Sequence, residues 1–423
     1  MRYPFSLFLL GLAAVPAQAQ DLQATIAAAL VHAPAVAEAR AGEDGAQARL
    51  DGARAERNPA MTLEGSYGAG RIDNGGFFGF TAAGTTPLSL RASGEMPLWT
   101  GGRVEAAMAG AGGGLAMAKA GAEATRLNVT VEAVAAYADV IGARRLLGQT
   151  RHLAEELELV VHQAQLRFQV GEIPASELAA ARARKAEGDA ASAMADARLA
   201  SAEAHYQRLT GAAPGELAPL PSPPVLPASL DEATGRAHAA NPALKQAEDG
   251  VAMARAGVRA AKAEGMPTIG AFAEATRMRD EFFPGYKADA VTIGVRGRWT
   301  PFAGGRVSAK VREADAAVSA SEARAAQARQ AIDGAMIDAW TGFRAAQRMV
   351  EASNLRVVAA REALRSTKLE ASVGAKTTLQ VLDAEREAMA AEATQIEAES
   401  RRLVVAWQVN ALAGNIQPQE PKP

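Results

Sequence analysis

The amino-acid sequence predicts a mainly α-helical protein with a small β part, built from a duplicated unit. Two stretches, residues 103–170 and 306–373, contain no proline and are long enough for very long helices. Short segments that alternate apolar and polar residues precede each stretch, and the same landmarks recur in both halves of the chain. An aromatic fraction of 5% with abundant Ala, Glu and Arg is typical of long helices that meet along narrow seams.

Residues 1–19 are predicted to be a secretion signal. Arg2 gives a positive start, residues 4–15 are apolar, and Ala17-Gln18-Ala19 forms a small-x-small cleavage site before Gln20. The apolar part is shorter than the roughly 20 residues of a transmembrane helix. An ordinary apolar N-terminal helix is the alternative. We expect the mature chain to leave the cytoplasm.

Composition excludes several classes of protein. Without cysteine the chain has no thiolate metal site, no disulfide scaffold and no cysteine for N-terminal lipid attachment. A net charge of −2 gives no electrostatic reason to expect a nucleic acid partner.

Equivalent landmarks recur at a constant spacing, which identifies an internal duplication. Pro34 and Pro59 match Pro242 and Pro267, each pair 208 positions apart (34 to 242, 59 to 267). Gly-Gly-Arg at 101–103 matches 304–306 at 203 positions (101 to 304), so one length change of five residues separates the two sets. We predict a first repeat over 20–211, a proline-rich connector over 212–228, a second repeat over 229–414 and a disordered tail over 415–423.

Each repeat is expected to open with two helices separated at a proline, 21–32 and 35–57 in the first copy and 230–240 and 243–264 in the second. Strands follow at 61–67 and 86–98, and at 268–276 and 291–299, the third with the poorest alternation. One side of these strands is apolar and the other polar. Such strands suit a soluble sandwich or a membrane barrel, and four strands alone cannot close a barrel.

The proline-free stretches predict helices of roughly 100 Å at ~1.5 Å per residue. A seven-residue repeat indicates a left-handed coiled-coil seam in each, Met336, Phe343, Val350, Val357 and Leu364 in the second copy and Val140, Leu147, Ala154, Val161 and Phe168 in the first. Each helix should reverse at a glycine tip into a shorter helix, 175–209 or 377–412. The cluster Gly110–Gly114 fits a close helix packing or a bend.

The duplicated order of helices, strands, Gly-Gly-Arg, long helix and tip resembles the outer membrane efflux protein family of TolC-type channels over nearly the whole mature chain. The most specific match is the second tip, Val373-Gly374-Ala375-Lys376-Thr377 with Val381-Leu382-Asp383-Ala384. The resemblance implies a homotrimer in the bacterial outer membrane that extends into the periplasm. Twelve strands, four per protomer, would form one shared transmembrane β-barrel, continued by a trimeric α-barrel of long antiparallel coiled-coil helices.

The resemblance also implies a passive exit duct of a tripartite efflux or type I secretion system, gated at the periplasmic helix tips. Its partners would be a periplasmic adaptor (membrane fusion) protein, an inner-membrane pump and outer-membrane lipid. The residues similar to the family's adaptor-docking tips are Val170, Gly171, Val373 and Gly374.

Gate residues follow from the same resemblance. Asp383 matches the second of two gate aspartates, and Gln380 stands at the first. Lys376 stands at a latch position, opposite Ser176 and Glu177 of the first copy. The hypothesis is that Lys376 pairs with Glu177 when the tips are closed while Asp383 rings the constriction, which favours cations. Ordinary solvated charges at helix ends are the alternative.

Motifs of an enzyme are not found. The five histidines show no metal-ligand spacing, and no nucleophile elbow or paired-carboxylate cleft appears, so we predict no catalytic residue, no metal and no cofactor. A soluble periplasmic coiled-coil scaffold or adaptor is the alternative function. It explains the signal and the helices but not the strand pairs.

Overall fold

The computed structural model describes residues 20–73, 75–76 and 82–414. The predicted signal (1–19) and tail (415–423) lie outside these residues. The chain divides into two compact units, one of Met1–Ala37, Thr125–Asn241 and Asp333–Pro423, the other of Glu38–Ala124 and Pro242–Ile332. Helices α3 (Arg103–Gln169) and α7 (Arg306–Ser372), 67 residues each, contribute to both units. The predicted long helices are confirmed.

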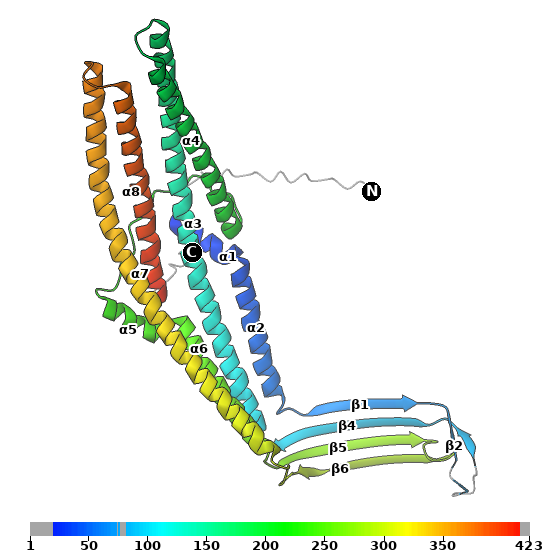
Figure 1. Cartoon of the computed structure of the whole chain (residues 1–423). Coiled ribbons are helices and arrows are strands. Elements are labelled where there is room, and N and C mark those ends of the chain that lie inside the picture. The colour runs from blue at the N-terminus through cyan, green and yellow to red at the C-terminus, as the bar shows by residue number, and fades with distance from the viewer. Residues whose placement is uncertain (1–19, 74, 77–81, 415–423) are drawn as a thin grey trace, which may run out of the picture. The chain divides into compact units, whose positions relative to one another are not determined.

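The unit of Glu38–Ala124 and Pro242–Ile332 contains the strands (Figure 1). Strands β1 (Ala60–Tyr67), β4 (Leu88–Trp99), β5 (Thr268–Arg279) and β6 (Lys287–Arg298) form an antiparallel sheet in that order. Each repeat thus supplies one hairpin, and the two hairpins join through β4 and β5. β5 and β6 both extend beyond their predicted bounds (268–276 and 291–299), because their pairing with each other continues to Arg279 and Lys287, past the alternating parts. The short strands β2 (Gly70–Ile72) and β3 (Ala83–Thr85) form a separate two-stranded sheet that was not predicted.

Helix α2 (Pro34–Ala55) precedes the sheet in the first repeat, and α6 (Pro242–Ala263) precedes it in the second. Glycines near the start of α3 allow α3 to pack closely against α6 in the same unit. A Cβ on Gly113 would lie 3.1–3.2 Å from backbone and Cβ atoms of Met253 in α6, whereas Gly112 has nothing within 4 Å. The packing explanation for the glycine cluster is therefore confirmed at Gly113.

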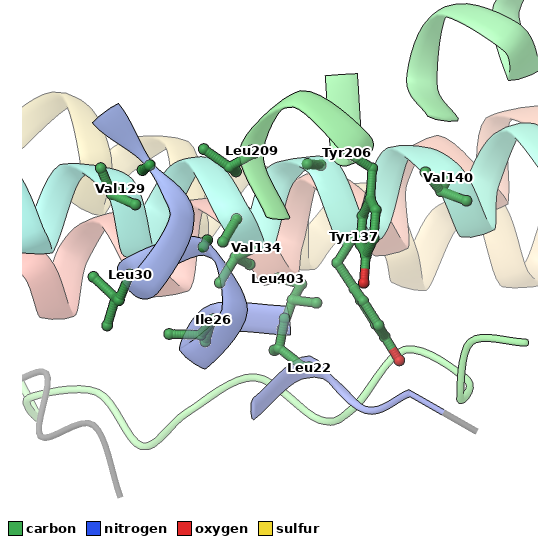
Figure 2. Close-up of a cluster of buried hydrophobic side chains, with 14 of the residues drawn as sticks. Leu22, Ile26, Leu30, Val129, Val134, Tyr137, Val140, Tyr206, Leu209 and Leu403 are labelled. Carbon is green, nitrogen blue, oxygen red and sulfur yellow. The ribbon is translucent and has the colours of Figure 1, made fainter. Parts of the chain in front are cut away.

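The other unit contains a large apolar core (Figure 2). It joins α1 (Leu22–His32), α3, α4 (Ala175–Thr210) and α8 (Thr378–Leu412), while α5 (Leu230–Ala240) lies in the same unit. Tyr137 is fully buried in this core, and its hydroxyl donates to the carbonyl of Ala218 at 2.6 Å. The Tyr206 hydroxyl lies 3.2 Å from Gln20 Oε1 and 3.0 Å from Thr25 Oγ1. The bond to Ala218 holds the connector, which carries no helix, against the core, and the contacts of Tyr206 hold Gln20 and α1 there.

The predicted seam is observed along α7. Met336, Val350 and Val357 are buried, and Phe343 and Leu364 are half-buried. In α3, Val140 and Leu147 are buried and Ala154 and Val161 are half-buried. Phe168, however, is 42% exposed.

The prediction for Phe168 was therefore wrong. Toward the tip the buried stripe of α3 consists of Leu157 and Ala164, which are the positions that face the returning helix α4. Ala164 packs with Leu178 and Ala181 of α4, and Phe168 projects elsewhere.

Candidate functional site

One face of the four-stranded sheet is apolar and is left uncovered by the residues that the structure describes. Cross-strand partners share a face, so Leu63, Ala92, Ala275 and Val291 lie on one side, because each is the register partner of the next. Exposed fractions on this side reach 72% at Leu63, 76% at Val291 and 80% at Ile293. A soluble domain rarely leaves so many large apolar side chains together in water.

The opposite face of the sheet is polar and carries ion pairs. Arg91 Nε lies 3.2 Å from Glu274 Oε1, and Arg296 Nη1 lies 3.2 Å from Glu95 Oε1. The Arg296 guanidinium also lies over the Phe272 ring, 4.5 Å from its centroid. All these groups remain partly exposed, so this face is suited to contact with water.

Both outer strands of the sheet have a free edge among the described residues. β1 pairs only with β4, and β6 pairs only with β5. An exposed edge is a row of unpaired backbone N–H and C=O groups and accepts another strand.

The two tips share one backbone design. Gly171 and Gly374 both have φ +79°, the left-handed conformation that ends helices at glycine. In the first tip the N–H of Gly171 donates to Phe168 O (3.0 Å), and in the second the N–H of Gly374 donates to Ala371 O (3.0 Å). Next to these glycines, Val170 is 71% and Val373 is 80% exposed. The predicted reversal residues therefore lie at the tips and present one apolar side chain each.

Gate residues of the second copy form contacts other than those predicted. Asp383 Oδ1 accepts from Arg184 Nη2 of α4 at 2.9 Å, and no sequence motif had indicated this arginine. Lys376 Nζ lies 3.9 Å from Glu370 Oε2, and within the described chain it forms no ion pair with Glu177. Gln380 completes a capping box with Thr377 at the start of α8. The pair of Lys376 with Glu177 remains a prediction.

Ser176 and Glu177 line a cavity of about 380 Å³ between the two tips. Ile173 and Pro174 of the first tip and Leu379 and Leu382 of α8 contribute apolar surface to it. The first-copy gate residues thus do lie beside the second-copy tip. Its charged lining residues are Arg167 and Glu177, and no ligand chemistry follows from them.

A half-buried ion pair below the tips was missed. Lys368 Nζ of α7 lies 2.7 Å from Glu385 Oε1 of α8, whose side chain is only 8% exposed, and 3.8 Å from Glu156 Oε1 of α3. The hydrogen bond to Glu385 raises the pKa of the Lys368 ammonium, and the charge of Glu156 adds to it. With the Arg184–Asp383 pair, this cluster connects helices of the first repeat to helices of the second.

In the part of the chain that the structure describes, no three His, Asp or Glu side chains are placed to hold a metal ion. No single described helix is long and apolar enough to cross a membrane; α1 and α2 pass that test only as a pair bent by 52°, on length and composition.

Comparison with known proteins decides the family. The model of the family described as "Outer membrane efflux protein" matches residues 25–212 and 233–415. This chain belongs to the outer membrane efflux protein family. The predicted family, the two-repeat fold class and the location in the outer membrane with an extension into the periplasm are therefore confirmed.

Individual proteins that are similar to this chain support the same family. The outer membrane efflux protein BepC of Brucella suis biovar 1 (strain 1330) is 29% identical over 222 residues, 52% of this chain and 48% of BepC. The match thus spans about half the length of that relative. The Campylobacter jejuni outer membrane channel CmeC superposes with a TM-score of 0.83 at 14% identity, covering 95% of this chain and 87% of CmeC.

A second solved structure, the outer membrane protein VceC of Vibrio cholerae, has a TM-score of 0.76 at 20% identity. It covers 93% of this chain and 96% of VceC. At these identities the likeness shows the fold alone, and what the chain transports does not follow from it.

Proposed function

We propose that the chain is the outer-membrane exit channel of a tripartite efflux or type I secretion system. Three copies share one barrel of twelve strands, four per protomer, and their helices form a duct that docks a periplasmic adaptor and an inner-membrane pump. Passage through the channel is passive, and the pump supplies the energy.

The observation that carries this proposal is the sheet with one bare apolar face, one polar face and two free edges. Strands of 12 residues are about 40 Å long at ~3.3 Å per residue. Tilted by about 40°, they span roughly 30 Å, the thickness of the bilayer hydrocarbon core. In the barrel the apolar face meets lipid and the polar face lines water.

Exposed apolar residues on the helices support assembly from several copies. On α7 of the single chain, Leu355 is 74%, Val358 is 66% and Leu369 is 65% exposed. They lie outside the buried seam that α7 uses within its own chain. Helices of a neighbouring protomer would cover such a stripe.

The tips supply the docking and gating surfaces of the proposal. Val170, Gly171, Val373 and Gly374 form the adaptor-docking loops, where the exposed valines offer apolar contacts. The Arg184–Asp383 pair acts as a tether between the repeats while the gate is closed. A partly exposed pair is worth about 0–1 kcal/mol, so three of them make a weak latch that a docked partner can release.

The protein mass of detergent-extracted outer-membrane material tests the channel. Light scattering with the detergent contribution subtracted should give three times the mass of the mature chain. A detergent-free monomer in the periplasmic fraction would contradict the proposal and favour the soluble scaffold.

Conductance of the purified trimer in a lipid bilayer tests the gate. Arg184→Gln should raise the closed-state conductance, whereas Arg182→Gln, an exposed arginine two residues away with no ion pair among the described residues, should leave it unchanged. Equal conductance in both variants would remove Arg184 from the gate. Lys376→Ala tests the predicted latch in the same way, and an unchanged conductance would end that idea.

A further inference from the structure

The two repeats have the same hairpin register, although their strand sequences differ. In the first hairpin Ala60 is the partner of Glu95, and in the second Thr268 is the partner of Arg298. Thr268 follows Ala60 by 208 positions (60 to 268) and Arg298 follows Glu95 by 203 (95 to 298). These are the offsets found from the prolines and from Gly-Gly-Arg in the sequence. Each residue of β1 and β4 therefore has a defined equivalent in β5 and β6.

This equivalence extends to the junction between the repeats. Within the chain, β4 of the first repeat pairs with β5 of the second, with Glu95 opposite Phe272 and Gly94 opposite Ala273. Between chains, the corresponding junction joins β6 of one protomer to β1 of the next. The residue pairs at this junction are found from the β4–β5 pairs. Adding 203 to a β4 residue number gives its equivalent in β6, and subtracting 208 from a β5 residue number gives its equivalent in β1.

Resting on the proposed shared barrel, we infer that β6 pairs with β1 of the adjacent protomer with Arg298 opposite Glu64. The neighbouring rungs place Gly297 opposite Gly65 and Val295 opposite Tyr67. The partner is a second copy of this chain, and the contact is an antiparallel strand pair with a charge pair on its polar face.

The charges of Arg298 and Glu64 support the same register, independently of the offsets between the repeats. Arg298 and Glu64 are both exposed, and neither forms a side-chain ion pair among the described residues. Both lie on the polar face, since Glu64 is the register partner of Arg91 and Arg298 that of Thr268. Opposite charges across a strand pair stabilise it, and like charges in the same position destabilise it.

Other registers that keep the apolar and polar faces matched do not place Arg298 opposite Glu64. A strand pair keeps its faces only when it shifts by an even number of residues, and the smallest such shift is two. One such shift places Arg296 opposite Glu64, but Arg296 already forms an ion pair with Glu95. The opposite shift places Arg298 against Ser66. Only the register carried over from the repeat uses both unpaired charges.

Cysteine cross-linking tests the register, and the chain has no cysteine of its own. Two double variants probe adjacent rungs, Arg298→Cys/Glu64→Cys and Gly297→Cys/Gly65→Cys. Adjacent rungs alternate between close and wide Cα spacing, about 4.5 and 5.5 Å, so one of them suits a disulfide. The shifted control is Arg298→Cys/Ser66→Cys, whose Cα atoms would lie about 8 Å apart, beyond disulfide reach.

We expect oxidation of the purified trimer to convert most chains into covalently linked trimers in at least one on-register variant and in none of the control. A trimer by light scattering that cross-links only in the control would overturn the register and leave the proposed channel intact. Particles that are not trimeric by light scattering would instead contradict the proposed function.

Charge reversal gives a second readout without cysteine. Glu64→Arg places like charges across the junction and should lower the midpoint temperature of trimer dissociation. Adding Arg298→Glu should restore it. If the double variant dissociates as readily as Glu64→Arg alone, the two side chains are not opposite each other and the register is wrong.

Discussion

The apolar face of the sheet can be tested at its centre. Ile293 lies in the middle of β6 and is 80% exposed, and its neighbour Thr292 points to the polar face. If the apolar face meets lipid, Ile293→Lys places a charge near the middle of the bilayer, which costs about 2–4 kcal/mol in barrel proteins. Over three protomers the cost is roughly 6–12 kcal/mol, comparable to the whole stability of a folded domain.

Thr292→Lys is the matched control, since the same side chain then enters the water-lined interior and costs little. The assay compares the two variants for the yield of trimer extracted from the outer membrane, and for the urea midpoint of trimer refolded into lipid vesicles. We expect Ile293→Lys to lose most of its trimer and Thr292→Lys to resemble the unmodified protein. In a soluble sheet both changes would stay within about 0.5 kcal/mol. Equal trimer yields in the two variants would refute the assignment of this face to lipid.

Three further predictions concern the helices. Gly113→Ala should lower the unfolding midpoint, because its methyl group meets the backbone of a neighbouring helix and overpacking costs about 1–3 kcal/mol. Gly112→Ala, which meets no neighbour within 4 Å, should raise the midpoint, since alanine favours the helix by up to about 1 kcal/mol. Burial raises the pKa of the Tyr137 hydroxyl from 10.0 to about 12. The contribution of this group to the free energy of unfolding is therefore complete below pH 10 and is lost as the pH rises toward 12. An ultraviolet titration should show one late-ionising tyrosine, which Tyr137→Phe removes. Lys368→Met should cost about 1–3 kcal/mol in urea unfolding, less than a fully buried pair because the lysine is 45% exposed, and adding Glu385→Leu should recover most of it.

Most of the secondary structure could be predicted because it depends on local signals. Proline and glycine mark the ends of the helices, and the seven-residue repeat identifies the side of α7 that is buried. Alternation found the four long strands. It could not find β2 and β3, because three residues such as Gly70–Ile72 carry no period. The exposure of Phe168 was missed since a heptad pattern does not say which helix covers which part of the seam.

The charged contacts of the site could not be predicted in the same way. An ion pair between two helices depends on their relative rotation and axial position, which the sequence of neither helix contains. The resemblance directed attention to equivalent tip positions, such as Lys376 and Glu177. Arg184 lies about two turns into α4, and Glu385 is hidden on the buried side of α8, so neither stands in a tip motif.

The pairing of Asp383 changes what a ring of this residue can do. Three bare carboxylates around a constriction would attract cations strongly, as the sequence led us to expect. In this chain the Asp383 carboxylate accepts from Arg184, whose side chain is only 25% exposed and also contacts Glu187 at 2.8 Å. The two acidic groups and one cation leave a net charge near −1 per protomer, spread over three side chains rather than concentrated at Asp383. In the proposed channel, a closed gate of this kind would restrict passage by holding the helices together, and cation preference should strengthen only when the pair separates and the carboxylates face the lumen alone.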